Sequence, residues 1–229
     1  QYNPTQPQGS AQIVAVYREL LKTHRPAQIA FIGLSGGCQF GGNTAFWLPS
    51  QKLPFPGAIA LMTCAGGRIA GDTRTTLNGL DPQLSDYTQF GAARRAGGAP
   101  AAIKPGDPQS EILNNGAVPK GFPPSWLLAG TRDLSLSQTV LLHRKLRGGG
   151  VIADLNIFEG MWHGFNMEPG LPETRDITVD LAGFLDRQGT PFYLTKRLME
   201  VAHIDDHGRP VRVPQWIIEL EAPVDVATL

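Results

Sequence analysis

Short, strongly apolar runs alternate with helical patterns along much of the chain, and this alternation limits the fold to a few architectures. Three runs, at residues 28–33, 57–63 and 125–130, are apolar enough for strands buried on both faces. In a fourth run, residues 151–158, apolar residues alternate with more polar ones, which indicates a strand nearer a sheet edge. Strand and helix following one another in this order predict an α/β protein, with a parallel sheet covered by helices.

The helical patterns lie beside these runs. One starts at Ser10 and ends at Arg25, because the proline after Arg25 disfavours helical backbone there. Another starts near Ser135, which has a capping-box spacing to Gln138, and stops at three consecutive glycines, 148–150. A third follows Pro172, and the stretch 41–49 could also be helical. The loop-rich residues 66–122 predict no element.

Composition narrows the class of protein. The 229 residues are 41% hydrophobic, and 20 Lys and Arg balance 20 Asp and Glu, which argues against nucleic-acid binding. No apolar run approaches the ~18 residues that suggest a membrane span. Cys38 and Cys64 are too few for a disulfide framework. The chain starts at Gln1 and shows no signal peptide, so we expect a cytoplasmic location, with N-terminal processing left open.

The first apolar run is followed at once by Gly33-Leu34-Ser35-Gly36-Gly37, which matches the pattern G-x-S-x-G. In that pattern a sharp turn from strand to helix exposes the serine hydroxyl. The pentapeptide is common by chance, and a glycine-rich turn after a strand can be purely structural. Its position between a strand and a possible helix is what favours a nucleophilic serine.

A serine hydroxyl needs a histidine base and an acid that orients this base. Behind a turn of this kind the expected chain order is serine, acid, histidine, each at the end of a strand. Asp133 comes just after the run 125–130, and His163 lies on the loop after the run 151–158. Order and positions both predict that Ser35, Asp133 and His163 form one site.

Two segments then resemble the hormone-sensitive-lipase-like family of α/β-hydrolases, which are mostly microbial carboxylesterases. VYRELLKTHRPAQIAFIGLSGG is similar to the family's helix, strand and nucleophile turn. GFPPSWLLAGTRDLSLSQTVLLHRKLRGGGVIADLNIFEGMWHGF is similar to its block from acid to histidine. The resemblance covers roughly residues 1–187, is weakest through 66–122 and stops before the tail.

This resemblance implies an α/β-hydrolase catalytic domain over residues 1–188 and a C-terminal extension over 189–229. Within this extension only residues 216–221 have the pattern of an extended strand, and an Asp-His-Gly turn at 206–208 precedes them. The extension could be a hairpin, an arm for a partner subunit or a mobile end.

The resemblance also implies the roles in the site: Ser35 as nucleophile, Asp133 as orienting acid, His163 as general base and the Gly36 N–H as one oxyanion donor. The implied reaction is hydrolysis of small to medium carboxylic esters through an acyl-enzyme, with no cofactor or metal. Trp162 either lines the acyl pocket or packs under its loop.

The sequence departs from the family at the turn. The family usually has an acidic or hydroxyl residue and then Ser-Ala-Gly-Gly, whereas here Leu34 precedes Ser35 and Gly-Gly-Cys follows. A rival alignment places residues 37–42 at the turn, with Gln39 in place of the serine, and predicts an inactive protein. It needs an insertion, so the alignment on Ser35 is favoured.

A second departure concerns the HGG loop, which supplies the family's other oxyanion donors. The only His-Gly pairs are His163-Gly164 and His207-Gly208, and neither continues with glycine. Tyr2 could match a tyrosine that follows this loop in the family. The fold is therefore expected to be N-terminally incomplete. The missing strands are supplied by a second chain, a homo-oligomer or a lost segment, or the tail's own strands substitute for part of the sheet.

Other hypotheses remain. The chain could be a non-catalytic or half-site subunit that needs a partner chain, or an acyltransferase that uses the same site. Cys38 could be a second nucleophile, although a buried small residue is favoured. A metal site at His203, Asp205, Asp206 and His207 is disfavoured, because a polar turn explains these residues equally well.

Overall fold

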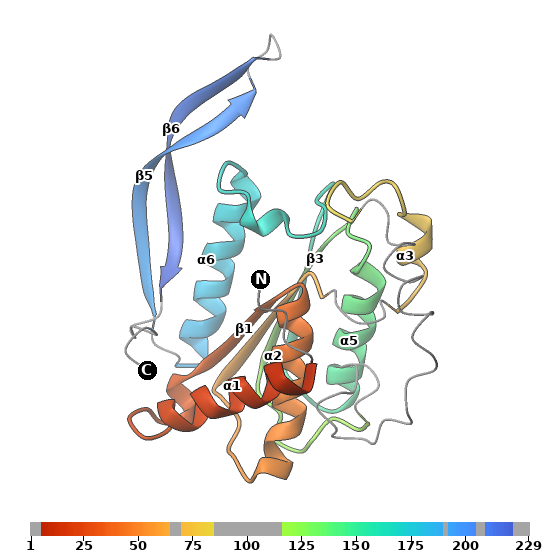
Figure 1. Cartoon of the computed structure of the whole chain (residues 1–229), viewed down its shortest axis with the longest axis vertical. Coiled ribbons are helices and arrows are strands. Elements are labelled where there is room, and N and C mark those ends of the chain that lie inside the picture. Colours follow the sequence, from red (N-terminus) through yellow and green to blue (C-terminus); the bar gives the residue numbers. More distant parts are fainter. Residues whose placement is uncertain (1–5, 65–69, 85–115, 190–191, 205–208, 222–229) are drawn as a thin grey trace.

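Four parallel strands form the central sheet of the structure (Figure 1), which is a computed structural model describing residues 6–64, 70–84, 116–189, 192–204 and 209–221. The strands are β1 (Ala30–Leu34), β2 (Ala58–Met62), β3 (Ser125–Gly130) and β4 (Ala153–Phe158), and they lie side by side in chain order. All neighbouring pairs are parallel, and β4 lies at an edge. The predicted parallel sheet is confirmed.

Helices lie beside these strands as the sequence predicts. The first of them is shifted, because it runs from Gln6 to Leu20 and not from Ser10 to Arg25. The helices are α1 (Gln6–Leu20), α2 (Gly36–Trp47), α3 (Thr73–Thr76), α5 (Leu136–Gly148) and α6 (Pro172–Arg187), with short 3-10 turns at Pro26–Gln28, Leu48–Gln51 and Phe165–Met167. Helix α2 starts directly after Ser35 rather than near residue 41, and α3 lies where no element was expected. Within the described residues, none of these helices has the length and apolarity that crossing a bilayer requires.

Side chains of β2 show how the two faces of the sheet are covered. Ile59 and Leu61 point to one face and pack with buried residues of α2 and α5. Ala58 and Ala60 point to the other face and pack with buried residues of α6. All four side chains are fully buried, because a strand in the middle of a parallel sheet has a helical layer on each side. The two layers fix the strand ends, where the candidate site residues lie.

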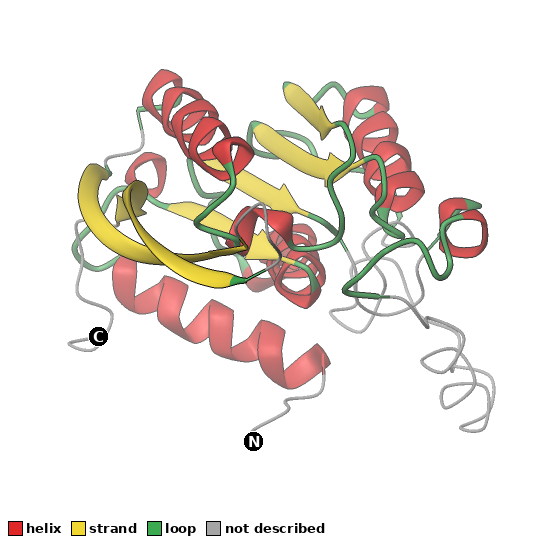
Figure 2. Ribbon diagram, turned by 90° about the horizontal axis from the view of Figure 1, so that it is seen from above, coloured by secondary structure: helices red, strands yellow, loops and turns green. Residues whose placement is uncertain are grey.

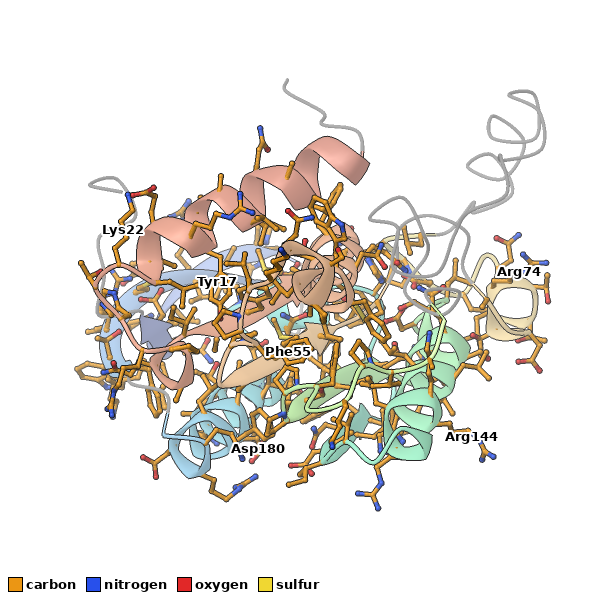
Figure 3. All side chains as sticks on the ribbon, turned by 90° about the horizontal axis from the view of Figure 1, so that it is seen from below. Tyr17, Lys22, Phe55, Arg74, Arg144 and Asp180 are labelled. Carbon is orange, nitrogen blue, oxygen red and sulfur yellow. A yellow bond between two sulfur atoms is a disulfide. The ribbon has the colours of Figure 1, made fainter. Side chains whose placement is uncertain are left out.

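Helix α1 packs on α2 through a smaller cluster around Tyr17. The Tyr17 ring lies edge-on to Phe31, with ring centroids 5.1 Å apart, and its hydroxyl donates a hydrogen bond to the Pro54 carbonyl oxygen at 3.2 Å. Figure 3 shows Tyr17 and Phe55 toward the interior, whereas Lys22, Arg144 and Asp180 lie at the periphery. Burial raises the pKa of Tyr17 from 10.0 to about 12.

This buried phenol predicts a stability loss at high pH. The folded chain holds the Tyr17 proton more tightly than the unfolded chain, so this contribution is complete below pH 10 and is lost as pH rises toward 12. Urea unfolding at a series of pH values should therefore show a decline above pH 10 that is smaller in Tyr17→Phe. At neutral pH the same variant should lose about 1 kcal/mol, because the hydrogen bond from the Tyr17 hydroxyl to the Pro54 carbonyl oxygen is lost. An equal alkaline decline in both proteins would contradict the assignment to Tyr17.

The tail forms a long antiparallel hairpin of β5 (Tyr193–Ile204) and β6 (Pro210–Glu221). The hairpin alternative is thus the one observed, whereas the expected turn at 206–208 lies outside the described residues. The hairpin is a separate two-stranded sheet, so its strands do not extend the main sheet. It lies beside α6 as a curved ribbon (Figures 1 and 2), held by the buried Ile217 and by a hydrogen bond from Gln215 Nε2 to the Gly170 carbonyl oxygen.

Candidate active site

Ser35 sits in a sharp turn between β1 and α2. Its backbone has φ 53° and ψ −117°, a conformation that residues other than glycine rarely adopt. The Ser35 N–H donates to the Met62 carbonyl oxygen of β2 at 3.0 Å, and the Ser35 carbonyl oxygen accepts from the Cys38 N–H at 3.1 Å. The strained residue is therefore held by the sheet on one side and by the first turn of α2 on the other, as in a nucleophile turn.

The glycines around Ser35 differ in what they contribute. A Cβ atom on Gly33 would overlap the carbonyl group of Gly37, so the close approach of β1 and α2 requires glycine at position 33. A Cβ on Gly36 or Gly37 would meet nothing within 4 Å. Gly36 is the first residue of α2, so its N–H has no acceptor within the helix and is available to an oxyanion beside Ser35.

His163 and Asp133 complete a hydrogen-bonded chain to Ser35. His163 Nε2 lies 2.8 Å from Ser35 Oγ, and His163 Nδ1 lies 3.1 Å from Asp133 Oδ1. Because an ionised carboxylate only accepts hydrogen bonds, Nδ1 carries the proton and Nε2 is free to accept the serine proton. Asp133 is fully buried and His163 is 6% exposed. The structure thus brings together the three residues that the sequence places at three strand ends.

Ser135 holds the same oxygen of the Asp133 carboxylate that faces His163. Its N–H and its hydroxyl both donate to Asp133 Oδ1 at 2.7 Å. The capping box predicted for Ser135 and Gln138 is therefore absent, because the serine hydroxyl is engaged with the carboxylate. Gln138 is buried as well and donates from Nε2 to the Cys64 carbonyl oxygen at 2.8 Å. Both side chains fix the start of α5 against the site.

The loop after β3, which carries Asp133, packs against the loop after β4, which carries His163. The Arg132 N–H donates to the Met161 carbonyl oxygen at 2.9 Å, and the Gly160 N–H donates to Thr131 Oγ1 at 2.8 Å. A Cβ on Gly130 would overlap the Met161 carbonyl, so only glycine permits this approach. These contacts hold the backbones of the two loops together, and they thereby bring Asp133 and His163 within hydrogen-bond distance.

The two cysteines form a disulfide that the sequence did not predict. Cys38 lies in the first turn of α2, Cys64 follows β2, and their Cα atoms are 5.3 Å apart. Both residues are fully buried, as favoured for Cys38, and the bond leaves Cys38 no free thiol for a nucleophilic role. The pair joins the helix that starts at Ser35 to the neighbouring strand end.

The remaining sequence candidates do not add to the site. Gln39 lies inside α2 and is buried, away from the turn that the rival alignment assigned to it. Trp162 is partly buried against the cluster under α6, and its role at an acyl pocket stays a prediction.

A metal-binding group is not found among the described residues: no three His, Cys, Asp or Glu side chains lie close enough together. The candidate residues 205–207 and the side chain of His203 lie outside the described part, as does Tyr2.

The sequence does not predict that Asp81 belongs to the site. Asp81 is fully buried, and its Oδ2 accepts hydrogen bonds from the backbone N–H groups of Leu134 and His163. It belongs to the loop-rich stretch 66–122, where weak periodicity gave no signal. The dipeptide Asp81-Pro82 reads there as an ordinary turn.

Comparison with known proteins defines the class. A family model described as the alpha/beta hydrolase fold matches residues 4–167, so the chain belongs to this family. The predicted resemblance to its hormone-sensitive-lipase-like members is confirmed by solved structures of such esterases. No curated protein sequence matches the chain.

Three of these structures show the extent of the similarity. The esterase E25 superimposes with a TM-score of 0.69 at 36% identity over 79% of this chain and 55% of its own. An esterase of the bacterial hormone-sensitive lipase family gives 0.69 at 26% identity, over 80% and 61%. An esterase/lipase from an uncultured bacterium gives 0.65 at 25% identity, over 80% and 59%. The chain therefore spans less than two thirds of the length of each.

Proposed function

We propose that this chain carries the catalytic site of a serine hydrolase that cleaves carboxylic esters. The observation that carries the proposal is the continuous hydrogen-bonded chain from Ser35 Oγ through His163 to the buried Asp133. This arrangement activates a hydroxyl that is otherwise a weak nucleophile. That solved relatives are described as esterases supports an ester as the substrate.

The geometry supports acylation of Ser35 as the first step. Ser35 Oγ attacks the ester carbonyl carbon while its proton passes to His163 Nε2, 2.8 Å away. The resulting imidazolium faces the Asp133 carboxylate, which stabilises the positive charge in a buried setting. The tetrahedral intermediate collapses as His163 returns the proton to the leaving alcohol, which leaves the acyl group on Ser35.

Water completes the cycle at the same residues. His163 Nε2 removes a proton from water, and the hydroxide oxygen attacks the acyl carbonyl carbon. Collapse of the second intermediate releases the carboxylic acid and returns the proton to Ser35 Oγ. The proton transfers in these steps use only Ser35, His163 and Asp133, and we expect the reaction to need no cofactor or metal. We expect Trp162, beside the base, to border the acyl group of small to medium esters.

Oxyanion stabilisation involves Gly36 and requires further donors. The Gly36 N–H at the start of α2 is one donor, and the sequence contains no His-Gly-Gly that would supply others. Since each donor contributes about 10²–10³ in rate, we expect full activity to need oxyanion donors in addition to Gly36, from a second chain or from a segment that is not among these 229 residues.

Labelling with a fluorophosphonate probe tests the proposal directly. The folded wild-type chain should be labelled covalently, Ser35→Ala should not be labelled, and His163→Ala should be labelled far more slowly. Ser50→Ala is the matched control, because this serine is exposed and donates to the Trp47 carbonyl oxygen of its own turn. Labelling that persists in Ser35→Ala, or a folded wild-type chain that stays unlabelled, would contradict the proposal and favour the non-catalytic alternative.

A further inference from the structure

Asp81 is a buried carboxylate whose two oxygens are fully used by backbone donors. Oδ1 accepts from the N–H groups of Gln83 and Leu84, at 2.9 and 3.2 Å. Oδ2 accepts from the N–H groups of Leu134 and His163, at 3.1 and 3.3 Å. The side chain has no exposed surface, so these hydrogen bonds replace the water that a carboxylate would otherwise hold.

The partners of Oδ2 belong to the two catalytic loops. Leu134 directly follows the acid Asp133, and the second N–H is that of the base His163 itself. One oxygen atom thus bridges the loop after β3 and the loop after β4. Asp133 joins the same loops through the imidazole side chain, whereas Asp81 joins them through the backbone.

We propose that Asp81 is a positioning residue that fixes the backbone of His163 relative to Asp133, so that Nε2 stays within reach of Ser35 Oγ. The inference rests on the proposed function and adds to it a residue outside the triad. It acts through the backbone of the two loops, since each of its oxygens accepts two hydrogen bonds from backbone N–H groups.

Asp81→Asn is the informative substitution. It preserves size and shape but replaces one acceptor oxygen with an NH₂ group, which cannot accept a hydrogen bond. If the amide oxygen stays bonded to the N–H groups of Gln83 and Leu84, the new NH₂ group faces the N–H groups of Leu134 and His163. These two N–H groups then have no acceptor. A misplacement of about 1 Å in a catalytic group can cost about 10²-fold in rate.

The test compares Asp81→Asn with Asp72→Asn in the full chain. Asp72 is the matched control, because its exposed carboxylate accepts from Ser137 Oγ at 2.9 Å and lies on the same segment. The first readout is the fluorophosphonate labelling rate of the folded fraction. We expect Asp81→Asn to be slower by about 10- to 10²-fold and Asp72→Asn to match the wild type.

A second readout separates positioning from general stability. By NMR, amide exchange at Leu134 and His163 should become faster in Asp81→Asn than its global free energy of unfolding allows, which marks local release of the loops. The downfield proton signal of His163 Nδ1–H should weaken as well. Wild-type labelling together with unchanged exchange at both amides would overturn the proposal.

These readouts also distinguish failure of the inference from failure of the proposed function. If the wild-type chain is not labelled, the proposed function fails, but exchange at the two amides still decides whether Asp81 holds the loops. If Asp81→Asn does not fold, the wild-type chain alone decides: slow exchange of the Leu134 and His163 amides supports the bridge. Exchange as fast as in an unprotected peptide overturns it.

Discussion

Replacing Asp133 with Asn should slow fluorophosphonate labelling of Ser35 by about 10⁴-fold, the effect expected when the acid of a catalytic triad becomes neutral. The buried carboxylate is the charge that faces the imidazolium of His163, and its Oδ1 atom defines which ring nitrogen carries the proton. A neutral amide keeps the shape of the side chain but removes both effects. The measurement is the second-order labelling rate constant, with circular dichroism to verify the fold.

Asp154→Asn provides the matched control for this prediction. Asp154 is the same residue type, lies on β4 and pairs with Arg187 at the surface, where it is 46% exposed. Exposed ion pairs of this kind contribute little, so both the labelling rate and the stability should stay at wild-type values. A folded Asp133→Asn protein that is labelled as fast as the wild type would show that Asp133 does not orient the base.

Removal of the disulfide should lower the free energy of unfolding by about 3 kcal/mol. Cys38 and Cys64 are 26 residues apart in sequence, so their bond restricts the unfolded chain by closing a loop of that size. The double variant Cys38→Ala/Cys64→Ala should show this loss in urea unfolding. Since both cysteines are fully buried, reductant should act on the wild-type chain only when denaturant opens it.

Reductant supplies the control for the disulfide. Unfolding in reductant should destabilise the wild-type chain by the same amount and leave the double variant unchanged. Two titratable thiols in the unfolded, non-reduced protein would contradict the bond. The cytoplasmic location expected from the sequence stays a prediction, and a bond that forms in cells would argue against it, because disulfides are rare in reducing compartments.

The sheet and the triad of Ser35, Asp133 and His163 were predictable because each of these residues lies just after the end of a strand. Apolar runs stop at Gly33, one residue before the end of β1, and at Gly130, the last residue of β3. In both cases a side chain would overlap a neighbouring carbonyl, so a glycine lies close to the end of each strand. Candidate polar residues just beyond such ends lie at one edge of a parallel sheet. Ser35, Asp133 and His163 could therefore be placed together without knowledge of distances.

Features that depend on distant partners were not predictable. The glycine-rich start of α2 has low helix propensity, and it is helical there because the turn at Ser35 and the buried packing impose it. Ser135 and Gln138 have the spacing of a local cap, but both side chains are buried and bond instead to Asp133 and to the Cys64 carbonyl oxygen, which follows β2. Strand β5 shows little pattern of its own and is defined by its pairing with β6.

The order of strands in the sheet equals their order along the chain, and this has a consequence for how the protein matures. Ser35 follows β1, and its base His163 follows β4, which forms an edge of this sheet. During synthesis Ser35 thus emerges well before His163 and stays chemically silent until β4 docks. The rate of phosphonate labelling would then report that β4 has docked on the sheet. A kinetic refolding experiment could follow this step through the labelling rate.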